Sequence, residues 1–205
     1  MLDAPLDGPV CTSCWDQVRP LPVLRGCASD GLLASWHAAG AYEGTLRDIV
    51  QAFKYDGRRV LARPLGAMMR EAGAGLLRDA DCVVPVPLHP WRRLRRGFNQ
   101  ADDLARQLGI PVVHALWRTR ATPPQTGLHA AARRRNVRQA FRLSPFLSRA
   151  SQRAWVTDRI VVLVDDVRTT GATMDACARV LIRAGAREVR ALTAARAAPP
   201  LTAAR

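Results

Sequence analysis

Long apolar runs are missing from this sequence. No stretch approaches the roughly 18 uninterrupted apolar residues that a membrane-spanning helix needs, so membrane insertion is not expected. The first residues also lack a basic segment followed by an apolar one, the pattern that marks a secretory signal peptide. We therefore expect a cytoplasmic protein.

Lysine is almost absent, because only Lys54 among the 31 basic residues is not an arginine. With 17 acidic residues, the formal net charge is +14. A surplus of this size attracts phosphate-rich partners, whether nucleotides or nucleic acid. A solvated basic surface would produce the same charge, so charge alone does not choose a function.

Cysteine is scarce, and the number of cysteines is odd. Five cysteines in a cytosolic chain do not predict a disulfide framework. Cys82 opens an apolar run and Cys177 lies on the apolar face of a predicted helix, so both are expected to be buried. Cys11, Cys14 and Cys27 have the spacing of three of the four ligands of a zinc knuckle.

The 205 residues are enough for one mid-sized domain and a small appendage. Residues 1–35 are rich in proline, glycine and cysteine and have little periodic pattern, so we assign them to the appendage and residues 36–205 to the domain. Within the domain, apolar runs predict strands and helical spacing predicts helices. Strands are expected at 82–87, 112–116, 141–143, 160–164 and 188–194, helices at 46–53, from 64 onward, at 101–108 and at 174–182, and a surface excursion at 144–158. This alternation favours an α/β fold with a mainly parallel sheet flanked by helices.

One segment carries a recognisable binding chemistry. An apolar strand over residues 161–164 is followed by Asp165 and Asp166 and then by a loop of small residues, 169–173, that opens a helix. In open parallel sheets, ligands bind beyond the carboxyl ends of the strands. Backbone amides of such a loop and the N-terminus of the next helix favour a phosphate, while two carboxylates suit vicinal ribose hydroxyls and a Mg²⁺ ion carried by a diphosphate. The competing interpretation is that the two acids only cap the helix.

The string V-V-L-V-D-D-V-R-T-T-G-A-T over residues 161–173 closely resembles the phosphoribosyl-pyrophosphate (PRPP) signature of type I phosphoribosyltransferases. The resemblance implies that Asp165 and Asp166 are the catalytic carboxylates and hold the ribose hydroxyls. It also implies that the residues after them bind PRPP, the 5′-phosphate lying in the loop: Arg168, Thr169, Thr170, Gly171, Ala172 and Thr173.

Four further segments extend the resemblance to nearly the whole chain. They are F-K-Y-D-G-R-R (53–59), V-P-V-P-L-H (84–89), R-R-G-F-N-Q (95–100), and Q-T-G-L (125–128) leading to R-N-V (135–137). In this order they resemble the ComF (GntX-like) family of competence-associated phosphoribosyltransferase-like proteins. By that resemblance the segment after the 82–87 strand contacts pyrophosphate, through Pro87, Leu88, His89 and Arg96, and residues 121–138 form a loop that closes over the substrate. Lys54 could reach the diphosphate, but a surface position is the default expectation.

In the same family the zinc segment usually contains a second C-x-x-C, and here the matching fourth position is Asp30. Cys11, Cys14, Cys27 and Asp30 are therefore the expected metal ligands, with His37 as an alternative fourth ligand. Decay of the site is the other possibility left open. Bound Zn²⁺ would be structural, holding a segment too short to form its own core.

Two functions of different classes follow. The first is an enzyme that binds PRPP with Mg²⁺ and transfers its phosphoribosyl group to an unknown acceptor, with release of pyrophosphate, in a cell that takes up DNA. The second is a single-stranded DNA-binding protein of DNA uptake, working with competence proteins, in which the PRPP site is regulatory or vestigial. Few aromatic residues interleave the arginine-rich segments, which counts against the second function. A transcriptional regulator on the same fold is a third possibility.

Overall fold

The structure is a computed structural model, and it describes residues 9–21, 32–88, 97–119 and 139–197. Its centre is a four-stranded parallel sheet with the order β1-β6-β5-β2. The strands are β1 (Ser35–Ala41), β2 (Cys82–Pro85), β5 (Ile160–Arg168) and β6 (Glu188–Arg196). A separate antiparallel pair is formed by β3 (Leu116–Arg118) and β4 (Phe141–Leu143). The predicted α/β fold with a mainly parallel sheet is confirmed.

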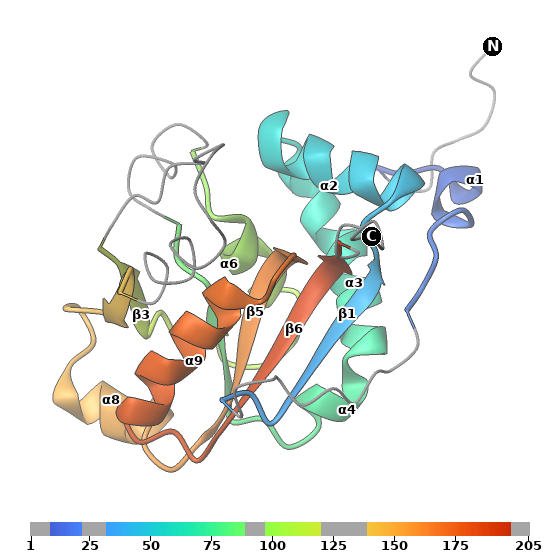
Figure 1. Cartoon of the computed structure of the whole chain (residues 1–205). Helices are drawn as coiled ribbons and strands as arrows, with labels where there is room; N and C mark the ends of the chain where they lie inside the picture. The colour runs from blue at the N-terminus through green and yellow to red at the C-terminus, as the bar shows by residue number, and fades with distance from the viewer. Residues whose placement is uncertain (1–8, 22–31, 89–96, 120–138, 198–205) are drawn as a thin grey trace, which may run out of the picture.

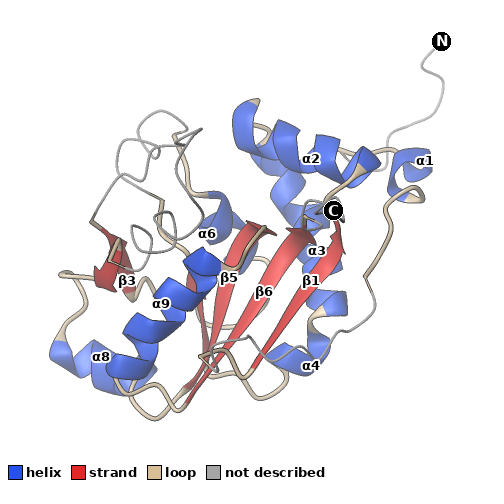
Figure 2. Cartoon of the chain, viewed as in Figure 1, coloured by secondary structure: helices blue, strands red, loops and turns tan. Residues whose placement is uncertain are grey.

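Helices cover both faces of this sheet (Figures 1 and 2). One face packs against α9 (Ala172–Arg183), and the other against α3 (Ala62–Ala72) and α6 (Gln100–Ala105). Two apolar clusters result, one on each side of the sheet, and the alternation of side chains along β5 divides its residues between them. The remaining helical elements are α1 (Thr12–Trp15), α2 (Gly44–Tyr55), a 3₁₀ turn (Arg59–Leu61), α4 (Ala74–Leu77) and α8 (Arg149–Trp155). Among the described residues, no helix has both the length and the apolar character that crossing a membrane requires.

Most predicted elements are present, and the differences have local causes. The strand expected at 112–116 is reduced to a single parallel bridge from Val112 to Val83, and β3 starts only at Leu116. The excursion expected at 144–158 contains α8, whose first turn is capped by the Ser148 side chain accepting a hydrogen bond from the backbone amide of Ser151. β1 was not predicted, because its sequence S-W-H-A-A-G-A shows neither β-branched residues nor alternation.

The segment before β1 is attached to the sheet. Pro20 forms an antiparallel bridge with Gly40, and the amide of Ala41 donates to the carbonyl of Arg19. A Cβ atom on Gly40 would lie 3.2 Å from that carbonyl oxygen and 2.5 Å from the Leu46 side chain, so only glycine fits here. The division into residues 1–35 and 36–205 stays a prediction.

Candidate functional site

The candidate site lies at the carboxyl end of β5. The strand was expected to end at Val164, but it continues to Arg168, because β6 is long enough to pair with it as far as Arg196. Asp165 and Asp166 therefore belong to the strand and, as consecutive strand residues, point to opposite faces of the sheet. This differs from a pair of acids at the start of a loop, and it places each carboxylate in a different environment.

Asp166 is on the α2 side and forms an ion pair with Lys54. The distance between Lys54 Nζ and Asp166 Oδ1 is 2.8 Å, and the two side chains are only 14% and 12% exposed. Burial acts to lower the pKa of Lys54, but the negative charges of Asp166 and, more weakly, Asp165 outweigh it and raise that pKa. The lysine also lies over the Tyr42 ring, 5.8 Å from its centroid. The default expectation of a surface lysine is wrong.

Asp165 is on the α9 side, and no residue in the described part of the chain forms an ion pair with it. Burial, and next the charge of Asp166, raise the pKa of Asp165 to about 7. Its Oδ1 accepts a hydrogen bond of 2.9 Å from the amide of Asp166, and the positive charges of Lys54 and Arg118 partly offset the rise. The pair thus holds more negative charge than its surroundings neutralise.

Arg118 was not recognised in the sequence. It lies on β3, is only 8% exposed, and its guanidinium is 5.2 Å from the centroid of the Phe141 ring. Its charge is felt by Asp165 and by the buried thiol of Cys177 on α9. No motif marks Arg118, because the pairing of β3 with β4 places it beside the site, and that pairing is a tertiary contact.

The loop after β5 has the backbone conformation that a phosphate cradle needs. Gly171 has φ +81° and immediately precedes α9, a helix of 12 residues. The positive φ favours glycine here, and a Cβ atom at this position would lie 2.5 Å from the guanidinium of Arg168, which would have to move. Thr169 and Thr170 are exposed, and Thr173 lies in the first turn of α9. The predicted loop residues are thus close together around one helix N-terminus, which favours an anion.

Arg168, in the same segment, packs against the Trp36 ring. Its guanidinium lies 4.1 Å from the centroid of the Trp36 ring, and Arg196 lies over the same ring at 5.1 Å. Burial, together with the nearby charge of Arg196, lowers the pKa of Arg168. Because Trp36 is on β1, this stack connects the loop to the far strand of the sheet.

On the opposite flank, Pro87 and Leu88 follow β2, which is the parallel neighbour of β5. The amide of Val86 donates to the carbonyl of Val164, so the chain leaves the sheet next to Asp165. His89 and Arg96, also predicted to contact pyrophosphate, and the predicted closing loop over residues 121–138 lie outside the described residues.

The comparisons with known proteins agree with this arrangement. Residues 94–200 match the family model of the phosphoribosyl transferase domain. The chain is 32% identical to competence protein F of Haemophilus influenzae, over 92% of this chain and 90% of that protein. The chain belongs to the ComF family of phosphoribosyltransferase-like proteins.

Two further similarities were found. DNA utilization protein YhgH of Escherichia coli is 36% identical, over 72% of this chain and 66% of that protein. Among solved structures, glutamine PRPP amidotransferase from B. subtilis, complexed with ADP and GMP, is 26% identical, with a TM-score of 0.41 over 65% of this chain and 26% of that chain.

In this ComF-family chain the structure describes only two of the four predicted zinc ligands, Cys11 and Cys14. Cys11 and Cys14 flank the first turn of α1, and a hydrogen bond from Ser13, followed by the neighbouring Cys14, lowers the pKa of the Cys11 thiol to about 7. Cys27 and Asp30 lie outside the described residues. His37 is buried within β1, and the described part of the chain brings no three potential metal ligands together, so the alternative of His37 joining Cys11 and Cys14 is not supported. The set with Asp30 stays a prediction.

Proposed function

We propose that this protein binds PRPP with Mg²⁺ at the carboxyl end of β5 and transfers its phosphoribosyl group to an acceptor, with release of pyrophosphate. The observation that carries the proposal is the position of Asp165 and Asp166, which lie near the carboxyl end of β5, a few residues before the glycine turn and the N-terminus of α9. The names of the relatives, competence protein F and DNA utilization protein YhgH, support a role in competence or DNA use.

The roles of the residues follow from charge. The ribose hydroxyls would donate hydrogen bonds to Asp165 and Asp166, and the 5′-phosphate would accept them from the loop amides and threonine hydroxyls of residues 169–173. As the bond from C1 to pyrophosphate breaks and the acceptor forms its bond to C1, positive charge develops on the ribose ring. Two carboxylates held near that ring by the strand stabilise this charge without having to reorganise.

The donor set also fits Mg²⁺. Asp165, whose charge its surroundings do not fully neutralise, could hold the ion directly or through water, whereas Asp166 is paired with Lys54. Mg²⁺ would neutralise charge on the departing pyrophosphate. The rise in the pKa of Asp165 has the same physical origin, because a buried carboxylate beside a second one favours any added cation or proton.

Isothermal titration with PRPP and Mg²⁺ tests the proposal. We expect saturable binding by the unaltered protein and binding at least about a hundredfold weaker in Asp165→Asn/Asp166→Asn, because each lost charged hydrogen bond contributes about 1.5 to 3 kcal/mol. Asp48→Asn/Asp56→Asn, at two exposed positions, removes the same charge and is the control. Equal binding by both double variants would exclude the β5 carboxylates as the PRPP site.

Single-stranded DNA binding is the second candidate function, and the net charge of +14 favours it. Arg95→Ala/Arg96→Ala is expected to weaken DNA binding and to reduce the slope of log affinity against log salt by about 1.4, the value for two lost phosphate contacts on a single strand. Filter binding or fluorescence anisotropy at several salt concentrations gives this slope. An unchanged slope would mean that this arginine pair is not the DNA site.

A further inference from the structure

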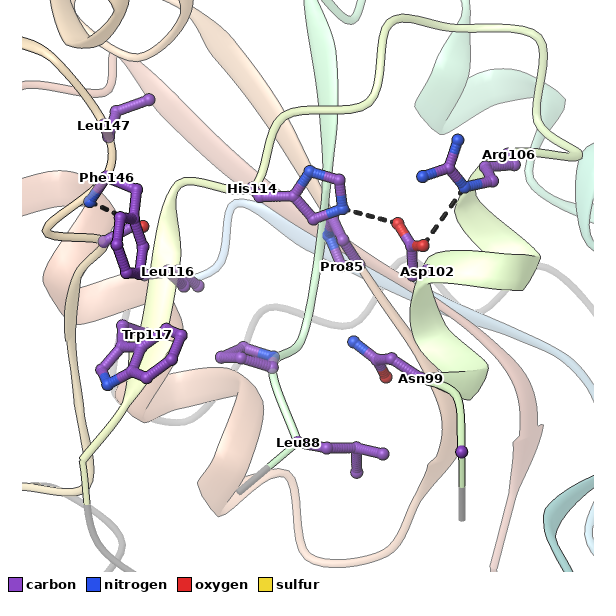
Figure 3. A pocket seen from close by; sticks show the side chains of 13 residues that line it. Pro85, Leu88, Asn99, Asp102, Arg106, His114, Leu116, Trp117, Phe146 and Leu147 are labelled. Atoms are coloured by element: carbon purple, nitrogen blue, oxygen red, sulfur yellow. Dashed lines mark hydrogen bonds and ion pairs between the residues drawn. The ribbon is translucent and has the colours of Figure 1, made fainter. Parts of the chain in front are cut away.

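A cavity lies beside the PRPP edge and shares Pro87 and Leu88 with the predicted pyrophosphate contact, but its other walls have no part in the proposed transfer reaction. Its volume is about 810 Å³, within the range of pockets that bind small molecules and cofactors. Figure 3 shows its two sides: β3 and the segment after β4 form one wall, α6 forms the other, and Pro85 at the end of β2 lies at the back. The residues named below belong to the described part of its lining.

The first wall is aromatic. Trp117 and Phe146 meet edge to face, with ring centroids 5.7 Å apart and an angle of 73° between the rings. Phe146 is 81% exposed, which is unusual because phenylalanine side chains are mostly buried in folded proteins. The exposed face of the Phe146 ring, held by its contact with the half-buried Trp117, is a flat, apolar surface on which a planar ring can stack.

The facing wall is polar and carries a cation. Asp102 accepts hydrogen bonds from Arg106 Nε, at 3.2 Å, and is 2.6 Å from His114 Nε2. The carboxylate therefore engages only one nitrogen of the arginine. Among the described residues, none accepts a hydrogen bond from the two terminal amino groups of Arg106.

The two walls together select a ligand with two different ends. A planar ring would lie against Trp117 and Phe146, and an anionic group would accept hydrogen bonds from Arg106. Asp102 is the acidic residue among the described lining residues and is already paired with Arg106, so an added anion meets no unpaired negative charge there. We propose that this cavity binds a single unpaired nucleotide, with its base on the aromatic wall and its phosphate at Arg106. The nucleotide could be free or part of a single strand, and the proposal does not depend on PRPP binding.

Titration calorimetry with thymidine 5′-monophosphate, on protein already saturated with PRPP and Mg²⁺ or on protein free of both, tests the proposal. We expect saturable binding in each case, because Phe146 and Arg106, which would hold the nucleotide, are not among the residues assigned to PRPP. Thymidine lacks the phosphate and ribose 5-phosphate lacks the base, so each is expected to bind at least about tenfold more weakly. Binding by ribose 5-phosphate as tight as that of the nucleotide would contradict a role for the aromatic wall.

Phe146→Ala and Arg106→Gln are each expected to weaken binding about tenfold or more, and both positions are exposed enough for the fold to tolerate the change. Tyr55→Ala and Arg63→Gln are the matched controls, an exposed aromatic residue and an exposed helical arginine elsewhere. The cavity is excluded as the site if the controls lose as much affinity as the pocket variants, or if no probe binds at millimolar concentration.

A thymidine oligonucleotide distinguishes the two sources of the nucleotide. At salt high enough to suppress nonspecific binding, a single strand that binds at least about tenfold more tightly than the monophosphate, and loses that gain in Phe146→Ala, identifies single-stranded nucleic acid as the source. If the oligonucleotide and the monophosphate bind with equal affinity per site, the free nucleotide is identified as the ligand. An oligonucleotide whose binding is unchanged in both pocket variants binds elsewhere and gives the cavity no support.

Discussion

Replacing Lys54 with methionine is expected to lower the free energy of unfolding by about 3 kcal/mol near pH 8. The methionine keeps most of the apolar stem but removes the charge 2.8 Å from Asp166, leaving a carboxylate that is only 12% exposed beside a second one. Removing one partner of a buried ion pair costs about 3 to 5 kcal/mol, and the small residual exposure places the expectation at the lower end. Urea denaturation followed by circular dichroism measures the difference.

A double-mutant cycle separates the ion pair from general damage to α2. Because Asp166→Asn removes the charge that Lys54 neutralises, we expect the double variant to be more stable than Lys54→Met alone, with a coupling energy of about 2 kcal/mol. Lys54→Arg keeps the charge and should recover part of the loss. A coupling energy below about 0.5 kcal/mol would show that the contact does not stabilise the fold.

Replacing Asp165 with asparagine is expected to stabilise the protein by about 2 kcal/mol near pH 8. The pKa of Asp165 is raised from 3.8 to about 7, so between these values the folded state binds more protons than the unfolded state. Stability from this group therefore falls as pH rises through the window, by at most about 1.36 kcal/mol per pH unit, and we expect about half of the full effect because the side chain is partly exposed. Asparagine keeps the acceptor for the Asp166 amide and removes the charge.

The pH dependence makes this prediction specific. The stability difference between Asp165→Asn and the unaltered protein should grow from about pH 4 to about pH 7 and then level off, as measured by denaturation at each pH. The charged and titratable groups that act on Asp165 are Asp166 on the same strand, Lys54 on α2 and Arg118 on β3, and Asp165 in turn acts on the Cys177 thiol on α9. Asp48→Asn, at an exposed position on α2, should show no such growth. A difference that is constant with pH would mean that Asp165 titrates normally.

The parts of the fold that could be predicted are those with strong local patterns. The apolar run before Asp165 and the spacing of Leu46, Val50 and Phe53 are local signals, and β5 and α2 are present as expected. β1 could not be found this way, because parallel pairing with β6 makes a strand of small residues that have no strand preference of their own. β3 likewise depends on its antiparallel partner β4, whose paired residues follow 23 to 27 positions later, from Arg118 with Phe141 to Leu116 with Leu143.

The candidate site shows the same division. The loop from Thr169 to Thr173 could be read from its small residues, and its geometry fits that interpretation. The burial of Lys54 has a signal in the sequence, because Leu46, Val50 and Lys54 are spaced four residues apart and share one face of α2. The default expectation for a lone lysine is nevertheless an exposed side chain. The proximity of Arg118 to Asp165 could not be predicted from any local pattern, because the two residues belong to different sheets and are brought together only by the tertiary fold.

The strand order has a consequence for how the chain assembles during synthesis. β6 lies between β1 and β5, so the strand that leaves the ribosome after all the other described strands fills a central position in the sheet. β1 pairs Ser35 with Arg190 and must wait for about 150 further residues before its parallel neighbour exists. Contacts this distant in sequence slow folding and leave strand edges exposed in the interval. Nascent chains of this protein therefore present an unpaired edge of β1 until β6 has been synthesised, and during that interval rapid folding or chaperones would limit aggregation.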